Sequence, residues 1–321
     1  MRSIKRAGWC GPYTAALLAL GHYLKQADYR FTTVTPATHA RINQRAGNEL
    51  GSTLTDLFGW NRVFAESAVE SHLFSLMLDA DILERSERGW RSKLRAATLN
   101  GELYFHSAYP TAAVDSVFFG PDSYRFAALL EQELDNCSSP PQRVVDIGCG
   151  AGPGALTVAK RLPAAEVIAA DINPSALVLC RTNAALAAVG NVTCCESNLL
   201  HEVNGEFDLI IANPPYLVDA DQRAYRHGGG ALGGALSLAI AEAALGRLRS
   251  GGTLMLYSGS VIVNGDDALL HEIERLLEAW PQVEWRYREL DPDIFGEELE
   301  HGPYTIADRI AAVALTLTRR G

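Results

Sequence analysis

With 321 residues and 48% hydrophobic residues, the chain has the size and composition of a soluble globular protein with two domains. No segment offers the ~18 uninterrupted apolar residues of a membrane span, and the apolar run 15–20 after the basic start 1–6 is short for a secretory signal, so we expect a cytoplasmic protein. The net charge of -10 is uneven, because residues 1–120 carry 13 Lys and Arg against 11 Asp and Glu, whereas residues 121–321 carry 15 against 27. An acidic C-terminal part repels phosphates, which argues against indiscriminate nucleic-acid binding.

The first 120 residues are predicted to form a small, mainly helical domain that ends in a β-hairpin. Apolar residues within Glu66–Leu78 recur at a spacing that builds one helical face. Asn100-Gly101 between two apolar segments is a hairpin signal. Helices are expected at Tyr13–Ala27, Pro36–Ala46 and Glu66–Leu78, and the segment Ile82–Leu99 leads into a strand at Glu102–His106.

This N-terminal part allows two interpretations. Basic residues gather around the Gly89-Trp90 turn, and helices followed by a basic hairpin are typical of a winged-helix-like module that touches nucleic acid. A solvated hairpin that packs the domain onto its partner is the alternative, and it is favoured because Glu84 and Glu87 dilute the positive charge. In the leading functional prediction, residues 1–120 form the domain that recognises the substrate.

Residues 121–321 are predicted to form an α/β domain with a Rossmann-like, mostly parallel seven-stranded sheet and helices on both faces. Val117–Phe126 is the expected hinge, where Gly120-Pro121 breaks the chain and Asp122 or Ser123 caps a helix that runs to about Leu134. Beyond it, strands are expected at Arg143–Ile147, Glu166–Ala170, Asn191–Glu196, Phe207–Ala212, Gly252–Tyr257, Val283–Glu289 and Ala311–Thr318, and helices at about Pro153–Leu162, Pro174–Val189, Leu232–Arg249 and Asp266–Trp280.

The segment Val144–Gly154, VVDIGCGAGPG, predicts a buried strand that turns sharply into a helix. Its glycines permit backbone angles and a close ligand approach that a Cβ atom would block, so a nucleotide-like ligand is expected there. Nicotinamide and flavin enzymes use the same kind of turn, and the loop alone leaves the cofactor open. Asp171, directly after the second strand, is placed to accept hydrogen bonds from both ribose hydroxyls, while Asn173 caps the next helix.

A second motif, IIANPPY at Ile210–Tyr216, follows a buried strand. With the glycine loop, it makes the chain resemble the class I S-adenosylmethionine-dependent methyltransferases of the small-methyltransferase-domain type, which include release-factor glutamine methyltransferases. The resemblance covers roughly the C-terminal 180 residues. IIANPPY also resembles the N6-adenine methylase signature, so it indicates an amino nitrogen as methyl acceptor without identifying the molecule.

The resemblance implies S-adenosylmethionine as cofactor and a planar NH2 group, an amide or a nucleobase amine, held by the Asn-Pro-Pro-Tyr turn. The Asn213 side-chain oxygen and the Pro214 carbonyl would accept its hydrogens, Pro215 would stiffen the turn, and Tyr216 would stack on the planar group. The glycine loop would offer free backbone N–H groups. The expected cofactor-binding residues are Asp146, Gly148, Cys149, Gly150, Gly152, Asp171, Ile172, Asn198, Asn213, Asp122 and Ser123. Asn198 stands where the family often has aspartate, and Asp122 and Ser123 are expected near the methionine end of the cofactor.

Two loops and the cysteines complete the prediction. Leu217–Gly234 is expected to form a lid, in which an exposed-loop role is preferred for His227 over that of a general base. The second loop, Glu289–Asp308, is acidic and either screens the site, meets a cationic acceptor or is simply solvated. The six cysteines show no CxxC spacing, so neither a disulfide framework nor a metal site is expected.

The leading functional prediction is an N-methyltransferase that acts on a protein glutamine or an RNA base. A small-molecule acceptor, such as a natural product, stays open. A non-catalytic protein that binds adenosylmethionine or RNA is the alternative from another class, and the intact NPPY turn argues against it. A nicotinamide oxidoreductase is disfavoured because the glycine pattern and the NPPY turn both fit methyl transfer better.

Overall fold

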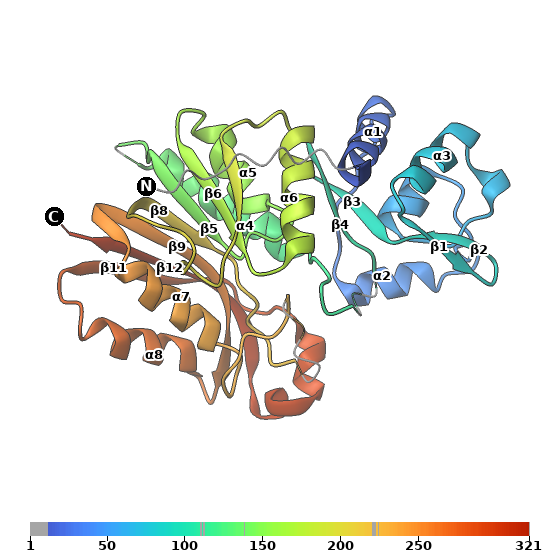
Figure 1. Ribbon diagram of the computed structural model, residues 1–321. Coiled ribbons are helices and arrows are strands. Elements are labelled where there is room, and N and C mark those ends of the chain that lie inside the picture. The colour runs from blue at the N-terminus through green and yellow to red at the C-terminus, as the bar shows by residue number, and fades with distance from the viewer. Residues whose placement is uncertain are drawn as a thin grey trace. The chain divides into compact units, whose positions relative to one another are not determined.

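A computed structural model of the chain describes residues 12–109, 111, 113–137, 139–219, 223 and 225–320. The chain divides into two compact units, one made of Met1–Pro110 with Ala185–Ala188 and the other of Thr111–Ala184 with Val189–Gly321 (Figure 1). The expected hinge, Val117–Phe126, therefore lies inside the second unit, and the helix that begins within it at Pro121 packs against the helix after the glycine loop. The basic start at residues 1–6 lies outside the described residues.

The first unit combines short helices with two antiparallel hairpins. The Asn100-Gly101 hairpin is confirmed, and both residues have left-handed backbones, φ 52° and 80°, as a two-residue hairpin turn requires. The segment expected only to lead into it forms a hairpin of its own, and its turn lies at Glu87-Arg88 rather than at Gly89-Trp90, because Gly89 and Trp90 are paired with Ser86 and Arg85. The elements are α1 (Pro12–Gln26), α2 (Pro36–Asn43), η1 (Thr55–Gly59), η2 (Glu66–Ala68), α3 (Ser71–Asp79), β1 (Leu83–Ser86), β2 (Gly89–Ser92), β3 (Leu94–Leu99) and β4 (Glu102–Ser107).

The second unit holds one large sheet in the order β11-β12-β9-β8-β5-β6-β7, and the predicted α/β, Rossmann-like, mostly parallel fold is confirmed. Strands β5 to β9 run parallel, and β12 is antiparallel to both of its neighbours. The strands are β5 (Arg143–Ile147), β6 (Glu166–Asp171), β7 (Val192–Glu196), β8 (Phe207–Ala212), β9 (Leu248–Val263), β10 (Asp266–Asp267), β11 (Val283–Asp291) and β12 (Arg309–Arg319).

Two expectations about this sheet were wrong. It has eight strands rather than seven, because the two-residue strand β10 folds back on β9. Strand β9 was expected to be short, yet it spans 16 residues because it is hydrogen-bonded to β8 on one side and to β12 on the other. The helix expected at Leu232–Arg249 is correspondingly shorter. The helices are α4 (Pro121–Asp135), α5 (Pro153–Arg161), α6 (Pro174–Leu186), α7 (Ala235–Leu245) and α8 (Ala268–Leu277), with η3 (Gly296–Glu300) and η4 (Gly302–Ile306).

The alternation of side chains along β5 assigns helices to the two faces of the sheet. Val145 and Ile147 belong to the buried cluster that also contains the inner faces of α7 and α8, which lie together in Figure 1. Asp146 points the other way and accepts a hydrogen bond from α5, against which α4 packs. Among the described residues, none of the helices has the length and apolar character that a membrane crossing requires.

Candidate active site

Three parallel strands end side by side at one edge of the sheet. Ile147 at the end of β5 is paired with Ala170 of β6 on one side and with Ala212 of β8 on the other. Each of these three residues is followed by one that lies at the carboxyl end of its strand, and these are Gly148, Asp171 and Asn213. Strand order reverses at β5, and in an open α/β sheet the carboxyl ends at such a reversal enclose the ligand crevice.

The three glycines of the loop serve two different purposes. A Cβ atom at Gly148 or Gly150 would meet nothing within 4 Å, and both have positive φ, 71° and 54°, so these positions face open space. A Cβ atom at Gly152 would lie 2.8 Å from the Cys180 sulfur, so that glycine permits close packing of the loop on α6. The loop thus leaves room for a ligand at its first two glycines only.

The loop's N–H groups were expected to be free, and several of them are not. Gly148 and Cys149 both donate to the Ala170 carbonyl, at 2.8 and 3.0 Å, and Gly150 donates to the Asp171 carboxylate at 2.9 Å. Cys149 is a buried thiol whose burial raises its pKa to about 12, so it fills space in the loop as an uncharged side chain. The loop therefore contributes mainly a rigid surface of defined shape, because several of its backbone N–H groups already donate hydrogen bonds within the protein.

Asp171 ties the loop to the second strand tip. Its other oxygen accepts the Asn173 N–H at 2.8 Å, and burial raises the pKa of the carboxyl. The expected helix cap is confirmed, since the Asn173 side chain accepts from the Ser175 N–H at 3.0 Å. Beside it, Ile172 is 55% exposed, an apolar surface of the kind that a nucleobase ring covers, and Asn198 is exposed after β7. These residues fit a nucleoside.

Asp146 acts as a cap inside the fold. Its carboxylate is buried and accepts the Ala155 N–H in the first turn of α5 at 2.8 Å. Burial raises the pKa of this carboxyl to about 7, against the opposing effect of that hydrogen bond, and the charge of Asp171 adds to the rise. A contact between Asp146 and the cofactor stays a prediction.

The raised pKa predicts how stability depends on pH. An unfolded aspartate titrates near about 3.9, so the contribution of Asp146 is complete below about pH 4 and is lost as pH rises through about 7. Asp146→Asn keeps an oxygen for the Ala155 N–H and does not titrate. Urea unfolding at about pH 5 and at about pH 8 measures the free energy of unfolding of both proteins. Between the lower and the higher pH, the native protein should lose about 1–3 kcal/mol more of this free energy than the variant loses. Equal pH dependence of the two proteins would contradict the burial argument.

The residues at the start of α4 lie elsewhere than expected. The helix is capped by Gly120, and the Ser123 hydroxyl accepts the Gly120 N–H at 3.3 Å, so neither Asp122 nor Ser123 is the N-cap. Both residues are 3% exposed. The Asp122 carboxylate accepts hydrogen bonds from the hydroxyls of Tyr216 and Tyr257, which occupies it within the protein.

The NPPY turn directly follows β8. The Asn213 side chain is partly exposed and makes no hydrogen bond to the residues that the structure describes, whereas Pro214 is buried. Tyr216, which was expected to stack on the acceptor, is 6% exposed, with its ring against Gly259 and Phe295 and its hydroxyl on Asp122. The turn therefore exposes its amide and buries its aromatic ring.

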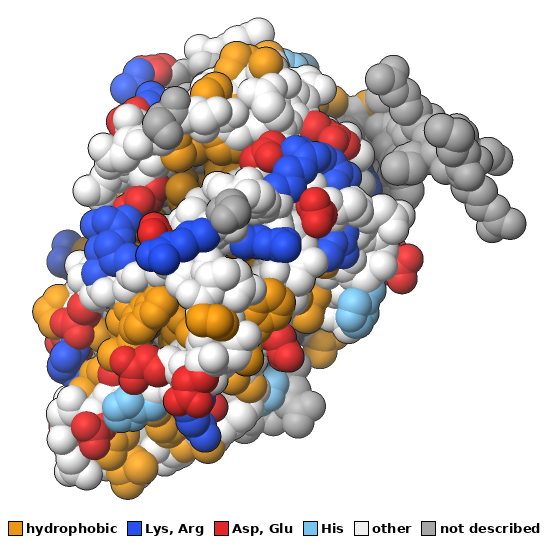
Figure 2. Space-filling view, turned by 90° about the vertical axis from the view of Figure 1, so that its left-hand side faces the viewer, with side chains coloured by type: hydrophobic (Ala, Val, Ile, Leu, Met, Phe, Trp, Pro, Cys, Tyr) orange, Lys and Arg blue, Asp and Glu red, His pale blue; other side chains and the backbone are white. Residues whose placement is uncertain are grey.

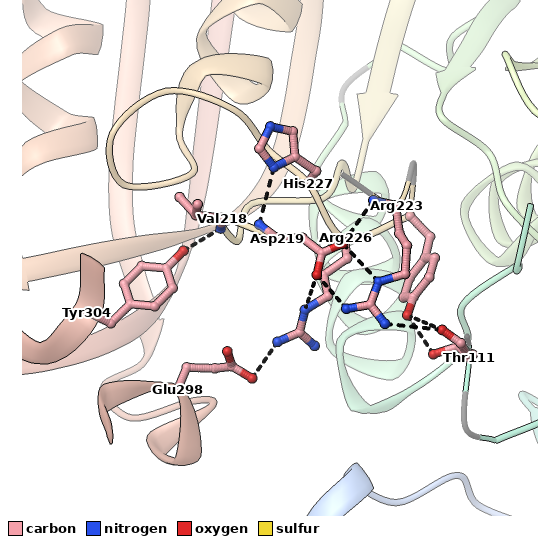
Figure 3. Close-up of polar contacts among 9 residues, drawn as sticks. Thr111, Val218, Asp219, Arg223, Arg226, His227, Glu298 and Tyr304 are labelled. Atoms are coloured by element: carbon pink, nitrogen blue, oxygen red, sulfur yellow. Dashed lines mark hydrogen bonds and ion pairs between the residues drawn. The ribbon is translucent and has the colours of Figure 1, made fainter. Parts of the chain in front are cut away.

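The loop expected to be a lid, Leu217–Gly234, folds back onto the turn in its described residues. Gly228 donates to the Leu217 carbonyl at 2.7 Å. The Tyr304 hydroxyl accepts the Val218 N–H at 2.6 Å, as Figure 3 shows. The His227 Nδ1 atom accepts the Asp219 N–H at 3.2 Å. Because this bond uses the lone pair of that nitrogen, His227 has a structural role in the loop.

Charged residues hold the same loop in place. Asp219 is buried and pairs with Arg223 and Arg226, and Arg226 also pairs with Glu298 of the acidic loop (Figure 3). The hydrogen bonds from Arg223 lower the pKa of Asp219 to about 2, so the pair stays charged across the working pH range. Sequence patterns did not reveal the roles of Glu298, Phe295 and Tyr304, for which the only signal was the two aromatic residues within an acidic loop.

Comparison with known proteins shows what the chain is similar to. A family model described as methyltransferase small domain matches residues 125–264. A release factor glutamine methyltransferase of Yersinia pestis is 32% identical over 260 residues, which cover 78% of this chain and 89% of that protein. Another, of Deinococcus radiodurans, is 37% identical over 141 residues, 42% of this chain, and the chain spans only 50% of its length. A transferase structure from Pyrococcus horikoshii is 15% identical, covers 78% of this chain and 82% of its own, and has a TM-score of 0.50, a likeness of fold alone.

Proposed function

The chain belongs to the family of release factor glutamine methyltransferases, within the class I S-adenosylmethionine-dependent methyltransferases, and we propose that it methylates the side-chain amide nitrogen of a glutamine in a protein. The resemblance indicated by the glycine loop and the NPPY motif is thereby confirmed at the level of the family. The cofactor of that family is S-adenosylmethionine.

One observation carries the proposal: Gly148, Asp171 and Asn213 follow the laterally paired residues Ile147, Ala170 and Ala212. Two of these tips suit a nucleoside, and the third offers an amide. Parallel strands stand about 4.8 Å apart, so the third tip lies within reach of a small group bound at the first two. This spacing supports a reaction between a cofactor and an acceptor nitrogen.

The residues present fit the cofactor. Open space at Gly148 and Gly150 leaves room for the cofactor beside the loop. The Asp171 carboxylate can still accept hydrogen bonds from ribose hydroxyls, and Ile172 offers an apolar surface for adenine. Asn198, exposed after β7, is the candidate for an adenine edge. S-adenosylmethionine supplies an electrophilic methyl group on a sulfonium sulfur.

Asn213 and Pro214 would hold the acceptor. An amide nitrogen is a poor nucleophile because its lone pair is delocalised into the carbonyl, so its two hydrogens must be held by acceptors that favour a localised lone pair. The Asn213 side-chain oxygen and the Pro214 carbonyl supply two such acceptors. Pro215 fixes its own φ, which keeps the two oxygens in one arrangement. The proton leaves to solvent after transfer.

The charges near the turn favour a protein acceptor over RNA. Arg223 and Arg226, the described cations of the 217–234 loop, pair with Asp219 and Glu298, so neither guanidinium faces a phosphate unopposed. Figure 2, which draws one face of the molecule without marking the turn, shows Lys and Arg side chains in a band with Asp and Glu side chains beside them. Phosphate backbones bind best to an uninterrupted basic track. A glutamine loop of a protein needs no such track.

The experiment offers tritiated-methyl S-adenosylmethionine with three acceptors in parallel: a purified bacterial release factor, bulk tRNA, and the small-molecule fraction of a lysate. We expect label in the release factor, at a glutamine, and none after that glutamine is replaced by alanine. Label in tRNA or in small molecules alone would overturn the choice of acceptor. No transfer to any of the three despite cofactor binding would favour the non-catalytic alternative.

Asp171→Ala is expected to weaken cofactor binding about 10- to 100-fold, because it removes both the proposed ribose contact and the bond that holds the Gly150 N–H. Calorimetry with S-adenosylhomocysteine, the demethylated cofactor, measures the change, and NADH should give no heat with the native protein. Asp79→Ala, an exposed carboxylate at the end of α3, is the control and should bind normally. Unchanged affinity in Asp171→Ala would contradict the assignment.

A further inference from the structure

A buried carboxylate joins three elements beneath the NPPY turn. The Asp122 side chain accepts the Tyr216 hydroxyl on one oxygen and the Tyr257 hydroxyl on the other, each at 2.7 Å. Arg125 donates to it at 3.2 Å and also pairs with Asp291. Asp122 belongs to α4, Tyr216 to the turn and Tyr257 to the central strand β9. The carboxylate thus connects the turn to parts of the sheet unit that are distant in sequence.

The Tyr216 ring is confined as tightly as its hydroxyl. A Cβ atom at Gly259 would lie 2.3 Å from the ring, so the glycine is what gives the ring its room. Phe295 meets the ring edge-on with centroids 6.1 Å apart, and it does so from a left-handed backbone, φ 54°, that is uncommon for a bulky residue. Burial and the Asp122 charge raise the pKa of Tyr216 well above its ordinary value, so its hydroxyl keeps the proton that it donates.

The two prolines explain why this anchor matters for the turn. Pro214 and Pro215 have no N–H groups, so the middle of the turn cannot be fixed by donating backbone hydrogen bonds. The backbone N–H groups that can anchor it therefore lie at its ends. One end is Ala212, which is paired with β5, and the other end is Tyr216. Because proline also fixes φ, a displacement at Tyr216 is carried through the turn to Pro214 and Asn213.

We propose that Asp122 is a positioning residue for methyl transfer, which acts through the Tyr216 hydroxyl to set the directions of the Asn213 and Pro214 oxygens. The proposal rests on the function proposed above for that turn. It assigns Asp122 to the acceptor side of the site, whereas its place in the sequence indicated the methionine end of the cofactor. Its effect should therefore appear in kcat and not in cofactor affinity.

The chain offers a matched pair of variants. Tyr216→Phe and Tyr257→Phe each remove one buried hydroxyl that donates to the same carboxylate at the same distance, 2.7 Å, but only Tyr216 belongs to the turn. A merely structural role would make the two variants alike. We expect similar losses of thermal stability, a fall of about 10- to 100-fold in kcat for Tyr216→Phe, and a kcat within about 2-fold of native for Tyr257→Phe.

The assay measures kcat and KM with a purified bacterial release factor as acceptor, and the affinity for S-adenosylhomocysteine by calorimetry. Affinity should stay within about 2-fold in both variants. Asp122→Ala combined with Tyr216→Phe should lower kcat no further than the stronger single change, because both act through one contact. Asp122→Asn, which keeps one oxygen, should recover part of the loss.

Equal kcat values for the two tyrosine variants, or additive effects of Asp122→Ala and Tyr216→Phe, would overturn the proposal. If Asp122→Ala does not fold, the tyrosine pair decides the matter without it. A native protein that binds S-adenosylhomocysteine and methylates nothing would instead refute the proposed function, so the two failures are distinct.

Discussion

Replacing Asn213 by alanine is expected to lower the rate of methyl transfer about 100- to 1000-fold while the affinity for S-adenosylhomocysteine changes by less than about 3-fold. The size follows from the loss of one preorganised polar contact at the reacting group, which costs about 10²–10³ in kcat in enzymes that stabilise charge in this way. Tritiated-methyl transfer to a purified bacterial release factor measures the rate, and calorimetry measures the affinity.

The structure explains why this variant should separate transfer from folding. The Asn213 side chain is partly exposed and has no hydrogen-bond partner among the residues that the structure describes, so its removal orphans no buried group. Its backbone follows Ala212, whose pairing with Ile147 does not involve the side chain. We therefore expect the thermal unfolding midpoint to change by no more than a surface substitution would change it.

Asn136→Ala is the matched control. This asparagine follows α4, is exposed, and donates to the Gln132 carbonyl at 2.8 Å, far along the helix from the turn. It should retain native transfer and native affinity. Persistent activity in Asn213→Ala would show that the acceptor nitrogen is held by other atoms, and the proposed role of the turn would have to be abandoned.

Local patterns in the sequence predicted the frame of this site. The strands that end at Ile147 and Ala212 were predicted to the residue, because short apolar runs flanked by polar or turn-forming residues are typical of buried parallel strands. The glycine loop and the Asn173 cap follow from backbone geometry that neighbouring residues dictate. Such features depend on contacts within a few positions along the chain.

The contacts between distant segments could not be predicted in that way. Asp122 and Tyr216 are 94 positions apart, and the bond between them depends on how α4 packs against the sheet. A short polar side chain at a helix start is ordinarily read as a cap, which is how Asp122 was interpreted. Tyr216 was expected to face the acceptor because aromatic rings often stack on planar groups, and the packing at Gly259 and Phe295 decided otherwise.

Gly228→Ala is expected to reduce methyl transfer at least about 100-fold, because the added methyl group would collide both with the NPPY turn and with Gly233, which packs on the turn. A Cβ atom there would lie 2.7 Å from the Pro215 carbonyl oxygen, 2.7 Å from the Tyr216 Cα atom and 2.0 Å from the Gly233 carbonyl oxygen. All three are backbone atoms, which cannot rotate aside as a side chain can. Steady-state transfer to a purified bacterial release factor measures the loss.

The direction in which the structure moves to relieve this clash decides whether methyl transfer or cofactor binding is lost. Gly233 is itself packed on the turn, since its own Cβ would lie 2.1 Å from the Tyr216 carbonyl oxygen, so the loop cannot retreat in that direction. The turn must move, and a shift of about 1 Å in a positioned group is enough to cost about 100-fold in rate. The cofactor side at Gly148 and Asp171 is untouched, so affinity for S-adenosylhomocysteine should persist.

Gly190→Ala is the control that separates crowding from backbone strain. Neither Gly228 nor Gly190 has a positive φ, so the backbone at both positions accepts alanine. The two positions differ in space, because a Cβ atom at Gly190 would meet nothing within 4 Å. Gly190→Ala should therefore keep native transfer and equal or slightly higher stability. Native transfer in Gly228→Ala would mean that the 217–234 loop yields without moving the turn, and that this loop does not support the acceptor site.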